Sequence, residues 1–198
     1  MSSEKDFFDK QIISLQDITI VFQYMHANAS LVNTSSLLRA EYVLIVSAFD
    51  NYLHQVVRKK VRESFFGGGD MPSNLNFPIS IFQIMNSETN AAEQQMIFDA
   101  GLKKVLEKDS YQSPKSLEYA LSLINVSHIW TKVAPGIGDT PEHIKSKLSI
   151  IVKRRNQIAH EADVDYSTGE PRLIDAQTVL ECREFLIMLV AGIDSLIS

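Results

Sequence analysis

The stretch RRNQIAH, residues 154–160, brings a guanidinium, an amide and an imidazole together on one predicted helix. Arg155 falls among the positions expected to face the core, and a buried guanidinium requires a carboxylate, a polar cavity or a bound anion. His160 follows five residues later and can take up or release a proton near neutral pH. Arg155, Asn156 and His160 are therefore the candidate catalytic residues for chemistry on an anion.

The spacing of these three residues constrains how they can act together. Asn156 and His160 are four residues apart and share one flank of the helix, whereas Arg155 and His160 differ by about 140° around an ideal helix. One regular helix therefore does not aim Arg155 and His160 at one small target. We expect that the helix bends or ends at His160, or that two copies of the motif face each other across a two-fold axis.

The elements that must position these residues are predicted to be helices. Apolar residues recur every three or four positions, the pattern of an amphipathic helix, and Gly, Pro and N-cap residues mark the helix ends. The long helices are predicted over residues 5–28, 35–66, 141–160 and 176–196. The second of these is apolar on two sides, which indicates burial on two sides or a subunit interface.

The segment between the second and third long helices has a different composition. GGGDMPSNLNFP, residues 67–78, is predicted to be a loop, and short helices are predicted near residues 79–86, 88–108 and 114–130, with another break at 134–139. No segment alternates like a strand. We therefore predict one all-α domain over residues 1–198, a bundle of long antiparallel helices with an inserted loop and short-helix segment at 67–139.

Composition excludes several classes of protein. The 198 residues carry a formal net charge of -5 and are 45% hydrophobic, which argues against a general nucleic-acid coat or a protein held to anionic lipid. Cys182 is the only cysteine, so there is neither a disulfide framework nor a CxxC metal site. The first ten residues lack the pattern of a signal peptide, and the longest apolar run is too short for a membrane span. A cytoplasmic protein with no membrane association is expected.

The motif and its setting resemble a known family, the HEPN domains of the RiboL-PSP type. RNQIAH fits the HEPN nuclease pattern of Arg, a polar residue, three further residues and His, near the end of the penultimate helix of a helical bundle. LLRAEYVLIVSAFDNYLHQVVRKKV is similar to the long helix of that type. These two elements cover about a third of the chain and stand in the right order.

The resemblance implies a metal-independent endoribonuclease that acts as a homodimer, with the RNxxxH motifs of both subunits lining one cleft and no cofactor. RNA would be cleaved by its own 2′-OH attacking the adjacent phosphate. His160 could then transfer a proton, Arg155 could bind the phosphorane oxygens, and Asn156 could bind phosphate or orient His160. Such domains are common among toxins and antiphage abortive-infection effectors.

Further residues are candidates for supporting roles. Asp50 and His54 lie four apart on the long second helix, where Asp50 could pair with Arg155 and His54 could contact RNA or His160. Two basic runs could form an RNA-binding rim in an otherwise acidic protein. The residues of that rim are Arg58, Lys59, Arg62, Lys153 and Arg154.

The same residues are also compatible with a purely structural motif, in which Arg155 forms a buried Arg–Asp pair and His160 lies at a helix C-terminus. A non-catalytic dimerisation or RNA-docking module of a larger assembly, and an antitoxin or immunity-type protein, are the alternatives to an enzyme. An antitoxin or defence-system partner is also conceivable for the nuclease itself. Some HEPN toxins carry a modifiable tyrosine two residues after the histidine, where this chain has Ala162.

Overall fold

The computed structural model describes residues 2–29, 33–72, 75 and 90–197 of the chain. Over these residues the chain is helical, with one isolated antiparallel bridge between Val164 and Pro171 and no strand within the described ranges. The helices are α1 (Ser3–Asn28), α2 (Ser35–Phe66), α4 (Ala91–Leu106), α5 (Pro114–Ser122), α6 (Ile129–Ile137), α7 (Pro141–His160) and α8 (Ala176–Ile197). The all-α class and the long helices of the prediction are confirmed.

The inserted segment differs from its prediction in two places. The single helix expected over 114–130 is wrong, because α5 ends in a Schellman turn with Asn125 in the left-handed conformation (φ 60°) and Val126 N–H donating to Leu121 O (3.0 Å). The break expected at 134–139 is also misplaced, since α6 runs through Pro135 to Ile137 and stops at Gly138. The helix expected at 88–108 corresponds to α4, and the one at 79–86 lies outside the described residues.

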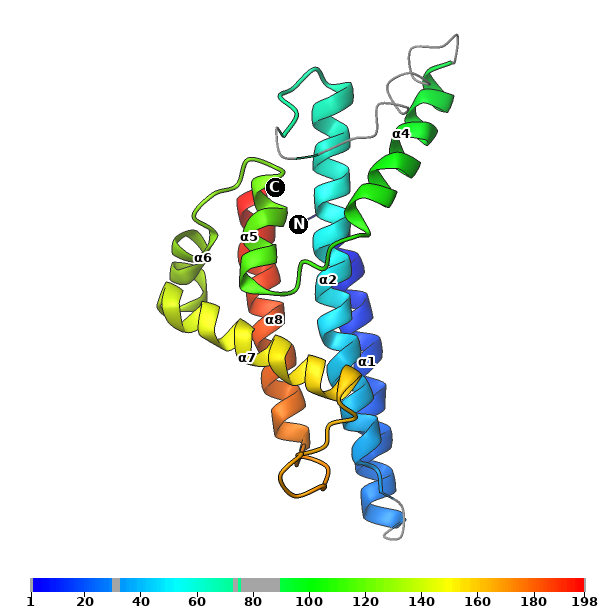
Figure 1. The fold of residues 1–198 in the computed structure, drawn as a ribbon, viewed down its shortest axis with the longest axis vertical. Helices are drawn as coiled ribbons and strands as arrows, with labels where there is room; N and C mark the ends of the chain where they lie inside the picture. The colour runs from blue at the N-terminus through cyan, green and yellow to red at the C-terminus, as the bar shows by residue number, and fades with distance from the viewer. Residues whose placement is uncertain (1, 30–32, 73–74, 76–89, 198) are drawn as a thin grey trace.

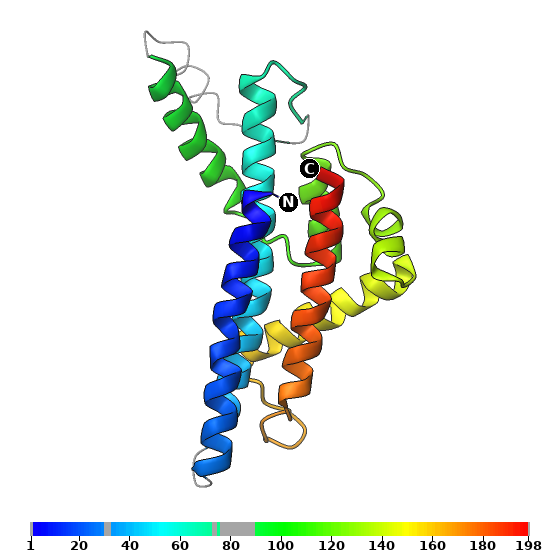
Figure 2. The ribbon, with the colours of Figure 1, turned by 180° about the vertical axis from the view of Figure 1, so that it is seen from behind.

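The long helices form a bundle that α7 crosses. α1 and α2 lie side by side and antiparallel, α8 packs against both, and α7 runs across α8 to reach α2 (Figures 1 and 2). α6 packs against α7 and α8, α5 packs against α2 and α7, and α4 packs on the far end of α2. The C-terminal end of α7, which carries the motif, is thereby placed against the first half of α2.

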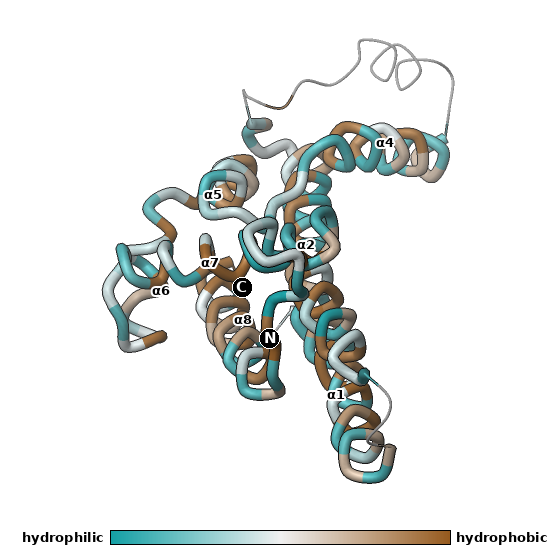
Figure 3. Tube along the Cα trace, turned by 60° about the horizontal axis from the view of Figure 1, so that its bottom comes forward, coloured by the Kyte–Doolittle hydropathy of each residue, from teal (hydrophilic) through white to brown (hydrophobic). Residues whose placement is uncertain are grey.

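α2 is buried on both of its apolar stripes, as its sequence predicts. Ile45, Phe49 and Leu53 have no exposed surface, and neither does Val57 on the second stripe. Burying each such side chain contributes about 1.5 to 3 kcal/mol, so α2 is the central element of the core. The helices around it are amphipathic, with apolar and polar stretches alternating along each tube in Figure 3.

A charged cluster lies inside this apolar core. Glu41 of α2, which is fully buried, forms an ion pair with Arg183 of α8 and accepts a hydrogen bond from Thr19 of α1 (2.6 Å). Arg183 also donates to the Thr19 hydroxyl (3.2 Å). The cluster therefore links the three longest helices through one carboxylate.

The two ends of the described chain are also joined. Ser2 caps α1 by accepting from Lys5 N–H (3.1 Å), and its backbone N–H donates to Asp194 near the end of α8 (3.2 Å).

No helix among the described residues is long and apolar enough to cross a bilayer.

Removing Glu41 tests the buried cluster. Glu41→Ala leaves the Arg183 guanidinium buried without its carboxylate, and we expect it to lower the free energy of unfolding by about 3 to 5 kcal/mol in urea titrations. Glu184→Ala on the exposed face of α8 is the control and should change stability by less than about 0.5 kcal/mol. The double variant Glu41→Leu with Arg183→Met should recover most of the lost free energy of unfolding, because neither charge is then buried. If Glu41→Ala were as stable as wild type, this description of the core would be wrong.

Candidate active site

α7 is fixed at its start by its cap and along its length by its apolar face. Thr140 accepts from His143 N–H (3.2 Å), and Pro141 occupies the first turn, where its missing N–H costs no hydrogen bond. The buried side chains along the helix are Ile144, Leu148, Ile151 and Val152. α7 ends at His160, as one of the two geometries expected from the spacing requires.

The two adjacent arginines of the motif have different surroundings. Arg154 forms a two-pronged ion pair with Asp163, whose carboxylate is fully buried, and also donates to Leu173 O (3.1 Å). Arg154 was expected in the RNA-binding rim, but its guanidinium is occupied by this pair. The buried Arg–Asp pair of a structural motif therefore exists, on Arg154 and not on Arg155.

Arg155 emerges from the middle of the buried stripe without a carboxylate. Its Nε is buried and has no hydrogen-bond partner, while Nη1 donates to the Asn156 Oδ1 of the next residue (3.2 Å). Among the described residues no Asp or Glu lies within ion-pair distance of it. A half-buried guanidinium without a carboxylate still has donors that an anion can accept from.

Asn156 and His160 lie on the exposed face of α7. They continue a stripe that begins at Ser149 and Lys153, because spacings of four and seven residues return to one side of a helix. The hydrogen bond from Arg155 brings that guanidinium toward Asn156, on the same side as His160. This contact joins the guanidinium of Arg155 to Asn156, one of the two other residues of the motif.

A groove runs along this face. It has a volume of about 420 Å³ and lies between the second half of α7 and the beginning of α5. Its lining residues include Lys153, Asn156, Gln157 and Ser113. The groove holds two amide side chains and a lysine without an ion-pair partner among the described residues, together with the carboxylate of Glu161. Of the three motif residues, Asn156 lines this groove, and Arg155 and His160 do not.

Asp50 and His54 do not join this site. Asp50 accepts from Tyr111 N–H (2.6 Å) and lies 4.0 Å from His54 Nε2, while the His54 ring stacks on Tyr111 with centroids 4.3 Å apart. The expected pairing of Asp50 with Arg155 is wrong, because Asp50 lies about 16 Å further along α2 than Arg39, the α2 residue that meets the end of α7. Asp50 and His54 instead anchor the loop between α4 and α5.

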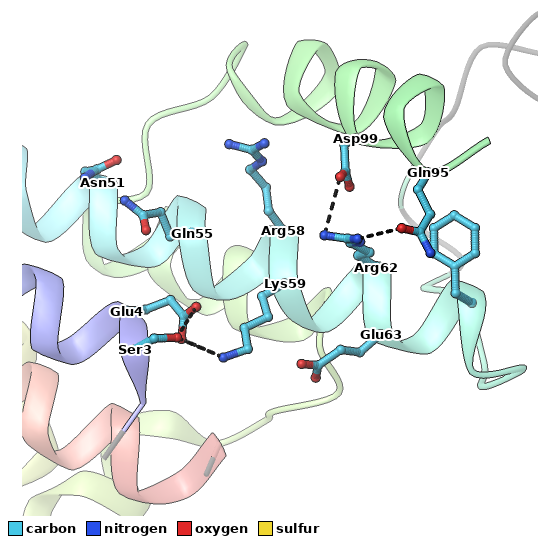
Figure 4. A pocket seen from close by; sticks show the side chains of 11 residues that line it. Ser3, Glu4, Asn51, Gln55, Arg58, Lys59, Arg62, Glu63, Gln95 and Asp99 are labelled. Atoms are coloured by element: carbon cyan, nitrogen blue, oxygen red, sulfur yellow. Dashed lines mark hydrogen bonds and ion pairs between the residues drawn. The ribbon is translucent and has the colours of Figure 1, made fainter. Parts of the chain in front are cut away.

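The basic residues of α2 lie in a separate groove. This groove of about 670 Å³ lies between α2 and α4 and contains Arg58, Lys59 and Arg62 (Figure 4). Lys59 pairs with Glu4 (3.0 Å) and Arg62 with Asp99 (3.5 Å), whereas Arg58 has no ion pair with a described residue. Since Arg58 is about 28 Å of helix beyond Arg39, these residues do not form one continuous rim with Lys153.

Other reactive groups are poorly placed for catalysis. Cys182 is buried, and burial raises the pKa of its thiol to about 12, so it is not an available nucleophile. Within the ranges that the structure describes, no three His, Cys, Asp or Glu side chains gather to hold a metal ion.

Sequence reasoning missed the residues that hold the end of α7. Asp163 is fully buried, and Arg39 of α2 donates to it through Nε (2.6 Å). The available signal was the sequence HEAD, residues 160–163, in which Asp163 follows closely after a helix end that carries Arg154 and Arg155. The sequence did not show which of these two arginines Asp163 would bind.

Comparisons with known proteins give one match. A family model described as RiboL-PSP-HEPN matches residues 9–198, almost the whole chain. The searches of curated proteins and of solved structures returned no match.

The contrast between the two arginines predicts different stability effects. Arg154→Ala removes one of the two guanidinium partners of the buried Asp163 carboxylate and should lower the free energy of unfolding by about 2 to 3 kcal/mol in urea. Arg155→Ala breaks no ion pair and should cost less than about 1 kcal/mol, mainly from loss of packing by its stem. If Arg155→Ala were as destabilising as Arg154→Ala, the description of Arg155 as a guanidinium without an ion-pair partner would be wrong.

Proposed function

The chain belongs to the RiboL-PSP-HEPN family, and from this membership and the geometry of α7 we propose that it is a metal-independent endoribonuclease. Its substrate would be RNA, cleaved through attack of a 2′-OH on the adjacent phosphate. HEPN-family membership by itself supports a function related to RNA cleavage or nucleotide binding. The finer assignment rests on how the side chains of α7 are placed.

The observation that carries the proposal is that Arg155 has no carboxylate partner among the described residues, whereas Arg183, whose Nε is also buried without an acceptor, has Glu41. A structural motif would place a carboxylate against it, as Asp163 is placed against Arg154. Arg155 instead keeps a buried Nε without a partner and leans toward the exposed face that bears Asn156 and His160. An anion would supply the missing acceptor, and a phosphodiester matches the two-pronged geometry of a guanidinium.

Each residue of the motif has a distinct role in the proposed reaction. His160, which is exposed at the helix end, transfers a proton either from the 2′-OH or to the leaving 5′ oxygen. Arg155 stabilises the negative charge on the phosphorane oxygens, and Asn156 holds the phosphate or orients Arg155. The ribose supplies the nucleophile, and the products are a 2′,3′-cyclic phosphate and a free 5′-OH.

Two proton transfers are needed, and each subunit offers one motif histidine. We propose a homodimer in which the exposed stripes of two α7 helices face one cleft, so that one His160 acts as base and the other as acid. The exposed position of His160 and Asn156 at the end of α7 supports such an arrangement. A toxin or antiphage effector, with an antitoxin or defence partner, is the proposed biological setting, and it rests on the family alone.

RNA is proposed to approach along the groove between α7 and α5. Lys153 is exposed there, one turn before Asn156, and Gln157 lines the same groove. Arg58 and its neighbours, in the groove between α2 and α4, would contact only a longer or second stretch of RNA, with Arg58 the one not already paired.

Cleavage in the presence of EDTA tests the proposed activity. Purified protein should cut single-stranded RNA and leave 2′,3′-cyclic phosphate ends, detected by end-group analysis of the fragments. His160→Ala should lower the rate at least about 100-fold, the contribution expected of a general acid or base. His143→Ala is the control, because His143 is exposed on the same helix and pairs with Asp139, outside the motif; its rate should match wild type.

Two results would overturn the enzyme assignment. RNA binding without cleavage would favour a non-catalytic HEPN module, a dimerisation or docking subunit of a larger assembly. Cleavage that survives His160→Ala would place the chemistry elsewhere in the protein.

The α7–α5 groove makes a separate prediction about RNA affinity. In a His160→Ala background, Lys153→Ala should weaken RNA binding and reduce the slope of log K against log salt by about 0.7, the loss of one phosphate contact on a single strand. Lys132→Ala, on the exposed side of α6, is the matched control and should leave the slope unchanged. Fluorescence anisotropy over a salt series measures both, and an unchanged slope for Lys153→Ala would exclude this groove as the RNA path.

A further inference from the structure

The chain reverses direction immediately after the motif histidine through an uncommon turn. Ala162 (φ 51°) and Asp163 (φ 58°) both adopt the left-handed conformation, which non-glycine residues seldom occupy and which persists only where the surroundings enforce it. Asp163 N–H then donates back to Gln157 O in the last turn of α7 (3.0 Å). Something other than backbone preference must therefore hold this turn in place.

The carboxylate of Asp163 provides that restraint. It is fully buried and receives Arg39 from α2 (Nε to Oδ2, 2.6 Å) and both terminal nitrogens of Arg154 from α7. The same guanidinium groups bind the returning chain, Arg39 to Arg172 O (2.6 Å) and Arg154 to Leu173 O (3.1 Å). We call Arg39, Arg154 and Asp163 the carboxylate clamp.

The ion pair of the clamp joins the residues on either side of the motif. Arg154 directly precedes Arg155, Asp163 lies three residues beyond His160, and the ion pair between them spans the whole RNxxxH segment. Arg39 holds the segment 154–163 against α2 through its contact with Asp163. Because neighbouring residues on a helix project about 100° apart, holding Arg154 toward Asp163 sets the direction in which Arg155 leaves the helix.

We propose that Asp163 is a positioning residue for the RNxxxH site, acting through Arg39 and Arg154 to aim Arg155 and to order the turn that carries His160. This inference rests on the proposed nuclease function for its effect on catalysis. Buried ion pairs often add little net stability compared with apolar packing, so their presence here accords with a role in orientation. A displacement of the reacting groups by about 1 Å can cost about 100-fold in rate.

The test compares two buried carboxylates, only one of which touches the motif. Asp163→Asn keeps the shape of the side chain but removes its charge, and we expect kcat for RNA cleavage to fall about 10- to 100-fold. The dissociation constant for the same RNA carrying 2′-fluoro groups, which lacks the nucleophile, should change less than about threefold. Glu41→Gln weakens the other buried cluster and lowers the melting temperature, but it should leave kcat near wild type well below melting.

A second measurement does not depend on activity. Hydrogen exchange read by mass spectrometry should be faster for amides in residues 157–163 of Asp163→Asn, with α1 and the first half of α7 unchanged, and Glu41→Gln should not show this local pattern. If wild type cleaves no RNA, the proposed function fails while the exchange result still decides whether the clamp orders the motif.

Two outcomes would overturn the proposal. One is a loss of kcat in Asp163→Asn no larger than in Glu41→Gln at matched residual stability. The other is unchanged exchange over residues 157–163. Should Asp163→Asn fail to fold, Arg154→Lys tests the same point, since it keeps the positive charge and loses the two-pronged contact with Asp163. Its kcat should again fall about tenfold. A kcat equal to that of wild type would contradict the positioning role of the clamp.

Discussion

A guanidinium taken out of water must find an acceptor, and this requirement organises the molecule around its arginines. Arg183 meets Glu41 in the core and so joins α8 to α2 and, through Thr19, to α1. Arg154 and Arg39 meet Asp163 at the end of α7. Arg155 has no such acceptor in the described protein, although its Nε is buried. This arginine belongs to the RNxxxH motif, which is the proposed site of RNA cleavage.

The fold accounts for how an arginine can remain unsatisfied without destabilising the bundle. α7 crosses the bundle and ends against α2 (Figure 1), and no side chain of its last two turns, residues 153–160, is fully buried. There the stem of Arg155 stays buried while its terminal nitrogens reach Asn156 and solvent. Deeper in the core, the same side chain would need a carboxylate, as Arg183 does.

The arrangement also separates two regions that the sequence suggested could act together. α2 is long enough to reach both the end of α7 and the distant groove against α4, and its polar residues are divided between them. Arg39 binds Asp163 next to the motif. Asp50 and His54, near the middle of α2, contact Tyr111 in the loop between α4 and α5, and Arg58 lines the groove further along the helix. The basic residues of α2 and α7 therefore do not form one RNA-binding surface. Arg58 lies about 28 Å along α2 from Arg39, and a straight helix cannot bring two residues so far apart to one site.

The sequence alone determined the all-α class, the extents of the long helices, the end of α7 at His160 and the RNxxxH motif, because periodicity, caps and motif spacing are local properties. It placed Arg155 on the buried stripe of α7 but could not show whether a carboxylate would face it. Only the tertiary structure decided that Asp163 pairs with Arg154, that Arg155 stays open and that Asp50 lies elsewhere. The separation of α5 from α6 was likewise decided by tertiary structure, because Asn125 and His128 between them both adopt the left-handed conformation, whose cost is offset by packing on both sides. Partners distant in sequence are chosen by how helices cross, and no local pattern encodes that choice.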